Sequence, residues 1–365
     1  MFNIITDFIL TKNIKIDKLG ITFRKLRNNE KKLILNQIDS IYLKNKKLIN
    51  YIIKNYNIED ELNLSIELLK YDELTRKIVK FCFFGVKSGF SLNSLSKIKK
   101  ILERVVIIEC DKDIISEYLE EDKISKLVSN ILSLYDIYSK NIRINEKVRL
   151  NYDYILTDNI INPNEEDYYQ NLIFNLVASF GSEKRMKKMV ELSEDYLLQL
   201  QKFISKLNKN QIRRFLTVVD LMYANYSMIQ NSIVNRVTII ESILLNEEND
   251  KRSNFILKTG LILKCYTGLE SEENNRFLNN ILGYTYDIRS AIVHGNEEKI
   301  LDIFNAITQK NKNIISLIHN NTDTYISKKN QAMILADTFA ILFVRAVIKY
   351  WIDNPSIISF MKNRY

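Results

Sequence analysis

The residues best suited to chemistry in this sequence lie in one decapeptide, YDIRSAIVHG, at positions 286–295. It contains Arg289, Ser290 and His294, and His294 is one of only two histidines in the 365-residue chain. An imidazole can give or take a proton near neutral pH, and a guanidinium can hold a phosphate through its planar fork. The decapeptide therefore has the residue types for acid–base chemistry on a phosphate ester.

Metal-free cleavage of RNA would need this set of groups. A base removes the 2′-hydroxyl proton, an acid protonates the leaving 5′-oxygen, and a cation offsets the charge of the phosphorane. One chain supplies a single Arg289–His294 pair. Two chains that meet through this helix would supply two pairs, so the number of groups favours a symmetric homodimer.

An arginine followed five residues later by a histidine is a weak motif by itself, because so short a pattern occurs by chance. In a structural interpretation, Arg289 pairs with a nearby carboxylate and His294 only ends a helix. In another, the chain is a helical scaffold in which the two residues share no role. The sequence on either side of the decapeptide bears on this choice.

The wider sequence resembles the HEPN superfamily, in its Apea-like branch. A tyrosine, an aspartate-x-arginine-serine and a closing histidine-glycine recur in that branch, as they do in YDIRSAIVHG. Upstream, NRVTIIESILL (235–245) is similar to the glutamate-bearing helix of the branch. Downstream, ADTFAILFVRAVIKYW (336–351) is similar to its closing helix, and the resemblance covers residues 205–355.

The resemblance implies a dimeric helical bundle with a metal-independent endoribonuclease site. Arg289 matches the family arginine and His294 the family histidine, which gives them the roles of phosphate clamp and general acid–base. Ser290 matches the polar position after the arginine and would orient the phosphate or His294. Glu241 matches the upstream glutamate and would position Arg289.

Two functional classes follow from this resemblance. Many members serve as toxins or in anti-phage defence and cleave RNA, often tRNA or mRNA. Others are non-catalytic modules that bind RNA, a nucleotide or a partner protein. The sequence leaves both open, with the endoribonuclease as our first hypothesis.

The decapeptide is predicted to end a helix that runs from Asn274 to Gly295, since glycine suits the left-handed position after a helix end. Tyr286, Ser290 and His294 would form one ridge of that helix. His294 would lie in the last turn, where unpaired carbonyls attract an imidazolium. The buried face is predicted to consist of Ile281, Leu282, Ile288 and Ile292.

The composition predicts a mainly α fold, because only 8 glycines and 2 prolines are present and strand-rich folds need frequent turns. Apolar residues recur at helical spacing in 29–56, 113–140, 210–230, 232–246, 251–267, 299–318 and 328–352. Runs rich in β-branched residues predict a few short strands within 1–30 and 103–113. A dense apolar run at 76–90 suggests a buried strand and turn.

A domain boundary is predicted in the segment 151–170, which is rich in Asn and Asp and contains Pro163. We predict an N-terminal α/β or mostly α domain over residues 1–150, with a candidate sensor or regulatory role. A helical connector would follow over 151–204. The HEPN-like helical bundle would then occupy residues 205–365.

The net charge of +9 and the pI near 9.1 favour a polyanionic partner such as RNA. The alternative is that the many Lys, Asn and Ile residues reflect the base composition of the genome. No uninterrupted apolar run reaches 18 residues, so we expect no membrane partner. The N-terminus lacks the pattern of a signal peptide, and we expect a cytoplasmic protein.

Metal and cofactor sites are not predicted. Cys82, Cys110 and Cys265 form no CxxC pair, which argues against a zinc site or a disulfide framework. Glycine-rich nucleotide motifs are absent from the sequence, and the short acidic clusters are interpreted as solvated loops. His319 is interpreted as a structural residue, since no arginine lies five positions before it.

Overall fold

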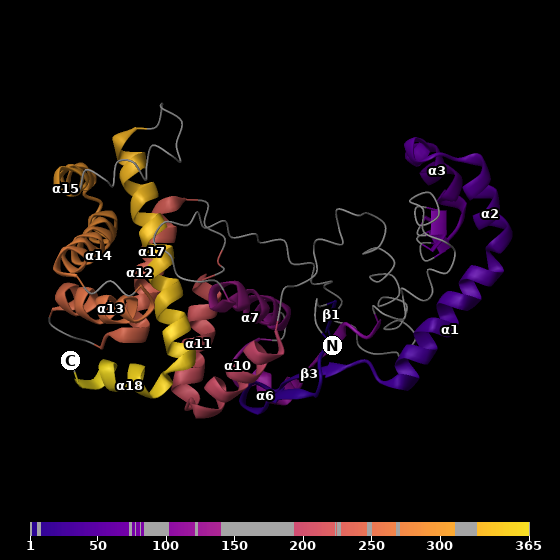
Figure 1. Cartoon of the computed structure of the whole chain (residues 1–365), viewed down its shortest axis with the longest axis horizontal. Helices are drawn as coiled ribbons and strands as arrows, with labels where there is room; N and C mark the ends of the chain where they lie inside the picture. The colour runs from indigo at the N-terminus through magenta and orange to yellow at the C-terminus, as the bar shows by residue number, and fades with distance from the viewer. Residues whose placement is uncertain are drawn as a thin grey trace. The chain divides into compact units, whose positions relative to one another are not determined.

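The fold is mainly α with a few short strands, as the composition predicts (Figure 1). The computed structural model describes residues 2–5, 9–72, most of 75–83, 102–120, 123–139, 193–222, 224, 228–246, 250–267, 271–310 and 327–364. The chain forms two compact units, one of Met1–Ser129 with Tyr152–Gln201 and one of Asn130–Asn151 with Lys202–Tyr365. The boundary predicted at 151–170 lies outside the described residues.

The first unit contains a four-stranded antiparallel sheet in the order β1-β4-β3-β2. Its strands are β1 (Phe2–Ile5), β2 (Ile14–Ile16), β3 (Ile21–Lys25) and β4 (Val105–Cys110). The strands predicted within 1–30 and 103–113 are therefore confirmed. Val105 to Ile108 are all buried, because strand β4 lies inside the sheet and both of its faces are covered.

Helices pack against this sheet. Those that share a core with it are α1 (Asn28–Lys44), α2 (Lys46–Asn55) and α3 (Glu61–Glu67). Helices α6 (Lys112–Ser116) and α7 (Ile124–Ser139) follow β4 in the chain, and α7 belongs to the second unit from Asn130 onward. The helical pattern at 29–56 thus forms two helices. Val105 and Ile107 of β4 share one core with Ile34 of α1, Ile49 of α2 and Leu64 of α3, which ties the helices to the sheet.

The buried strand predicted at 76–90 is wrong where this segment is described. The described residues from 75 to 83 are helical. The carboxylate of Asp72 accepts hydrogen bonds from the Thr75 backbone N–H (2.9 Å) and hydroxyl (2.6 Å), as an N-terminal helix cap does. The buried side chains recur at helical spacing: Thr75, Ile78, Val79, Cys82 and Phe83.

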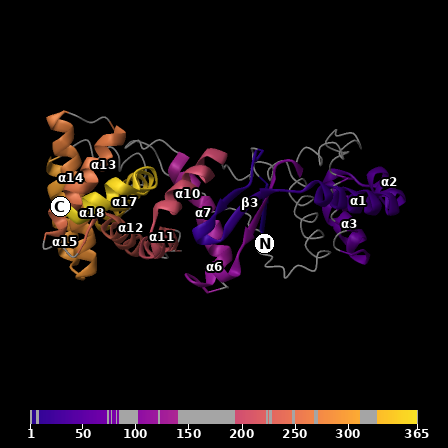
Figure 2. The same cartoon turned by 90° about the horizontal axis from the view of Figure 1, so that it is seen from below.

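The second unit is a helical bundle. Its elements are α11 (Lys209–Met222), α12 (Ile229–Leu244), α13 (Lys251–Thr267), α14 (Glu272–Val293), α15 (Glu297–Lys310), α17 (Lys328–Asp353) and α18 (Pro355–Arg364). The preceding helix, α10 (Glu194–Lys206), belongs to the first unit up to Gln201 and to the second unit from Lys202. Helix α17, in yellow, contacts α12, α13, α14, α15 and α18 (Figures 1 and 2). The helix α18 was not predicted, and it begins with Pro355 at a position where proline suits a helix start.

Among the described helices of the bundle, α17 alone is both long enough and apolar enough to cross a bilayer. Its 26 residues are long and apolar enough to cross a membrane by length and composition, and 78% of its most apolar window is buried inside the protein. Fully buried helices of soluble bundles meet the same criteria. Packing against five other helices therefore accounts for the apolar character of α17.

Candidate functional site

The helix that carries the decapeptide, α14, runs from Glu272 to Val293, close to the prediction. Its first turn is capped by Ser271, whose hydroxyl accepts a hydrogen bond from the Asn274 N–H at 3.2 Å. Ile281, Leu282 and Ile288 are buried as predicted, and Ile292 is half-buried.

Helix α14 ends in a Schellman motif centred on Gly295. The N–H of Asn296 donates to the Ala291 carbonyl at 2.9 Å, and the N–H of Gly295 donates to the Ile292 carbonyl at 3.1 Å. Gly295 has φ +64°, a left-handed conformation that costs glycine little. His294 is the C-cap residue between the last helical turn and this glycine.

His294 is exposed, but its backbone is held on both sides. Its N–H donates to the Ser290 carbonyl at 3.1 Å. Two residues later the Asn296 side chain accepts from the Lys299 N–H at 3.0 Å and starts α15. The histidine therefore occupies a fixed point in a short connection, with its imidazole open to solvent.

The structure brings Arg289 and Glu241 together. The Arg289 Nη2 lies 2.9 Å from the Glu241 Oε2, and the two side chains are 23% and 16% exposed. Glu241 comes from α12, which packs against α14. This contact agrees with a positioning role for Glu241, and the structural interpretation of Arg289 expects an ion pair of the same kind.

The ion pair leaves polar atoms unused. Within the described part of the chain, the Glu241 Oε1 and the Arg289 Nε are buried and have no hydrogen-bond partner. A buried polar atom in this state costs folding free energy, on the order of 1–3 kcal/mol. Such atoms are common where a ligand or water completes the hydrogen bonding.

Tyr286 packs beside the ion pair. Its ring centroid lies 5.9 Å from the Arg289 Cζ and 5.2 Å from the ring of Phe255 on α13. Burial and the nearby negative charge of Glu241 raise the pKa of the Tyr286 hydroxyl. Tyr286 therefore stays neutral at physiological pH and can act only as a hydrogen-bonding and packing group there.

The ridge of Tyr286, Ser290 and His294 runs from the core to the surface. Tyr286 is buried, Ser290 half-buried and His294 exposed. No hydrogen bond or ion pair of the described residues joins the side chains of His294 and Arg289. Within one chain, the Arg289 side chain is therefore half-buried in the bundle, whereas the His294 side chain lies on its surface.

Helix α14 has a second ion pair, which was not predicted from the sequence. Asp287 accepts from the Nε (2.7 Å) and Nη2 (2.8 Å) of Arg252 on α13. Arg252 lies across Gly283, where an added Cβ would meet its Nη2 at 2.9 Å. Arg289 and Asp287 therefore bind α14 to two different helices, and no spacing along the chain signals the pair with Arg252.

No cluster of three or more His, Cys, Asp and Glu side chains in the described part of the chain could hold a metal ion. The second histidine, His319, lies outside the described residues.

We found no match to a protein-family model, a curated protein or a solved structure. The interpretation of the site therefore rests on its residues, their contacts and the resemblance of the decapeptide.

Proposed function

We propose that the C-terminal bundle is a metal-independent endoribonuclease of the HEPN type, acting in toxin or anti-phage defence. The observation that carries the proposal is the 2.9 Å contact between Glu241 of α12 and Arg289 of α14, the helix that ends at the exposed C-cap residue His294. The pair fixes a cation and still leaves the buried Nε of the guanidinium without a partner among the described residues.

The proposed roles follow from chemistry. His294 transfers protons to and from the reacting oxygens, which an exposed imidazole can do near neutral pH. Arg289 clamps the phosphate and offsets the charge that develops on it. Glu241 is a positioning residue for Arg289, and Ser290 orients the phosphate or the imidazole.

The proposal includes a homodimer, because one chain supplies a single histidine of this kind. Val293, next to His294, has a 51% exposed apolar side chain, which suits a residue that a second chain covers. We expect light scattering after size-exclusion chromatography to give twice the mass of the 43.1 kDa chain. Val293→Glu should shift the protein towards monomer, and cleavage should fall with it.

The experiment that tests the activity uses the full chain with total tRNA and a single-stranded RNA in EDTA. The parent protein should produce discrete fragments with 2′,3′-cyclic phosphate ends. His294→Ala should reduce the cleavage rate about 100-fold or more, with an unchanged circular dichroism spectrum because the side chain is exposed.

The matched control is His319→Ala, which removes the other histidine of the chain and should cleave as the parent does. Equal cleavage by His294→Ala would overturn the assignment of the general acid–base. Saturable RNA binding without cleavage, unchanged in His294→Ala, would favour the non-catalytic binding module.

A further inference from the structure

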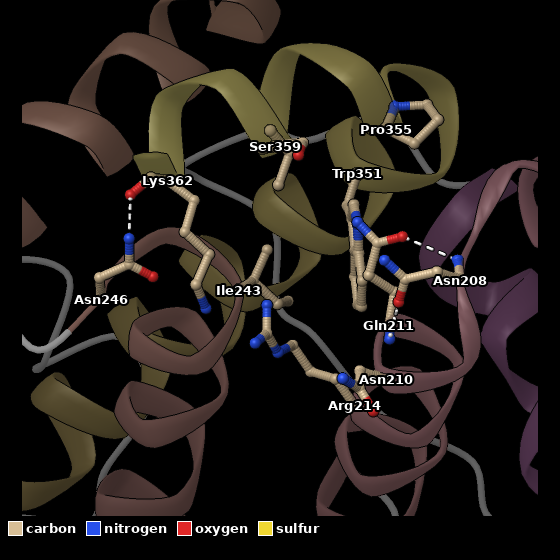
Figure 3. Close-up of a pocket in the computed structure, with 11 residues that line it drawn as sticks. Asn208, Asn210, Gln211, Arg214, Ile243, Asn246, Trp351, Pro355, Ser359 and Lys362 are labelled. Carbon is tan, nitrogen blue, oxygen red and sulfur yellow. Dashed lines mark hydrogen bonds between the residues drawn. The ribbon is translucent and has the colours of Figure 1, made fainter. Parts of the chain in front are cut away.

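A cavity of about 260 Å³ lies in the bundle between α11, α12, α17 and α18 (Figure 3). Its floor includes Ile243 of α12 and Trp351 of α17. The Trp351 ring is held in place by edge-to-face contacts with Phe203 (5.3 Å) and Phe215 (6.1 Å). Glu241 lies two residues before Ile243 on α12 and therefore points to another side of that helix.

Two cations face this cavity from different helices. Arg214 of α11 and Lys362 of α18 both line it, and their side chains point towards one another in Figure 3. None of the described residues that line the cavity is acidic. Two like charges that converge on one cavity repel each other, and an anion between them removes that cost.

The remaining polar lining can donate hydrogen bonds to such an anion. Asn210 and Ser359 carry an amide and a hydroxyl group at the cavity. The Asn246 amide donates to the Lys362 carbonyl at 2.7 Å, and the Lys362 Nζ donates to the Ser242 carbonyl at 2.6 Å. These bonds fix the cationic residue of α18 against α12.

The start of α11 does not supply the anion site. Asn208 and Gln211 line the cavity, but their side chains accept each other's backbone N–H at 2.9 Å in both directions (Figure 3). This reciprocal capping uses two of the N–H groups at the helix start. Recognition of an anion therefore falls to the Arg214 and Lys362 side chains.

A groove adjoins this cavity and offers space for a second part of the ligand. It has a volume of about 380 Å³ and shares Gln211, Pro355 and Ser359 with the cavity. Its lining adds the apolar side chains of Leu207 and Phe360, the latter 48% exposed, and the polar side chains of Lys206 and Ser356. The combined site has two cations at the cavity and a mixed apolar and polar lining in the groove, where Lys206 adds a third cation.

We propose that this cavity binds a phosphate monoester, with the phosphate between Arg214 and Lys362 and the organic part in the adjoining groove. The planar fork of arginine matches a phosphate, and lysine adds a point charge. The proposal does not depend on the nuclease activity, because it concerns binding at different residues.

The test is isothermal titration of the full chain with adenosine monophosphate and with inorganic phosphate, at constant ionic strength. We expect saturable binding of both, with tighter binding of the nucleotide. Arg214→Gln should weaken both affinities at least about tenfold. The matched control is Arg213→Gln, which removes an exposed neighbouring arginine outside the cavity lining and should leave both affinities unchanged.

Lys362→Gln gives an independent test from α18 and should also weaken binding, with Trp351 fluorescence checking that each variant is folded. Failure of the parent protein to bind either probe would overturn the proposal, as would equal losses in Arg213→Gln and Arg214→Gln. Equal affinity for the two probes would remove the adjoining groove from the site.

Discussion

Two arginines, one in each compact unit, are held by glutamates in contrasting ways. Arg24 of β3 is 5% exposed and donates to both carboxylate oxygens of Glu30 at 2.9 Å and, through Nε, to Glu109 at 2.7 Å. It also donates to the Lys25 carbonyl at 3.0 Å. Arg289 has one hydrogen bond, to Glu241, and its Nε has no partner within the described part of the chain.

This difference separates an arginine that completes a core from one that retains binding capacity. The guanidinium of Arg24 is bonded at all three of its nitrogens and joins β3, β4 and α1. Arg289 is oriented by one carboxylate from α12, and its proposed role as a phosphate clamp requires such orientation before a ligand binds. Burial alone does not make this distinction, but the number of hydrogen bonds does.

The largest effect that would test this comparison is on stability. Arg24→Met should lower the free energy of unfolding by about 3–5 kcal/mol, because it leaves Glu30 buried and uncompensated. Arg289→Met should cost about 1–3 kcal/mol, since one half-buried carboxylate loses one partner. Urea denaturation measures both, with circular dichroism reporting on the whole chain.

The single tryptophan, Trp351, belongs to the second unit. Its fluorescence should therefore follow the Arg289→Met transition more closely than the Arg24→Met transition. Lys32→Met, at an exposed lysine of α1, is the control and should change little. Equal losses at positions 24 and 289 would contradict the distinction.

A second effect concerns activity. Arg289→Lys keeps the positive charge but loses the planar fork, so RNA cleavage should fall about 100-fold with little change in the urea midpoint. The rate of tRNA cleavage in EDTA measures this. Cleavage at the parent rate would assign Arg289 to structure, as its counterpart Arg24 is.

A smaller effect is expected at Gly283. An alanine there would place its Cβ 2.9 Å from the Arg252 Nη2, so Arg252 must move away from Asp287. Alanine favours the helix by up to about 1 kcal/mol and the exposed ion pair is worth at most about 1 kcal/mol, so the two effects oppose each other and the net change in stability should stay within about 1 kcal/mol. The coupling between Arg252→Ala and Asp287→Ala in a double-mutant cycle should vanish in Gly283→Ala. A coupling that persists would show that Arg252 does not depend on the glycine.

The smallest effect uses the three cysteines as local probes. Burial raises the pKa of the Cys82 thiol to about 12 and that of Cys110 to about 11, whereas Cys265 is exposed. Burial disfavours the thiolate, so reactivity of the first two rises only as the pH approaches these values. At about pH 8, Ellman's reagent should label Cys265 first.

Arg24→Met should speed the labelling of Cys110, which follows Glu109 on β4, while Arg289→Met should not. Fast labelling of all three cysteines in the parent protein would mean that the first unit opens more readily than its closed arginine network suggests.

Local signals in the sequence predicted the helix of the site well. Gly295 predicted the end of α14, because its capping role depends only on neighbouring residues. The start was predicted at Asn274, whereas Ser271 caps the helix and the first residue is Glu272. The pairing of Glu241 with Arg289 spans 48 residues, and the sequence suggested it only through the resemblance. The pair of Arg252 and Asp287 carries no such signal and was missed.

The segment at 76–90 shows where composition misleads. Its apolar residues favoured a strand, but Asp72 caps a helix there and the buried positions follow the helical period. The cavity could not be predicted either, because α11, α12, α17 and α18 each contribute to it. Its two cations, Arg214 and Lys362, are 148 positions apart and meet only in the folded bundle.

The Schellman motif at the end of α14 has a thermodynamic consequence for His294. The proposed role of His294 requires a well-positioned imidazole, and His294 has no burial to position it. Here the backbone entropy of His294 is already lost on folding, because hydrogen bonds on both sides define its φ and ψ. Only the two side-chain torsions remain to be ordered when a ligand arrives, at a cost of about 0.5–1.5 kcal/mol. A solvent-exposed imidazole can thus be nearly preorganised by a glycine that touches no ligand.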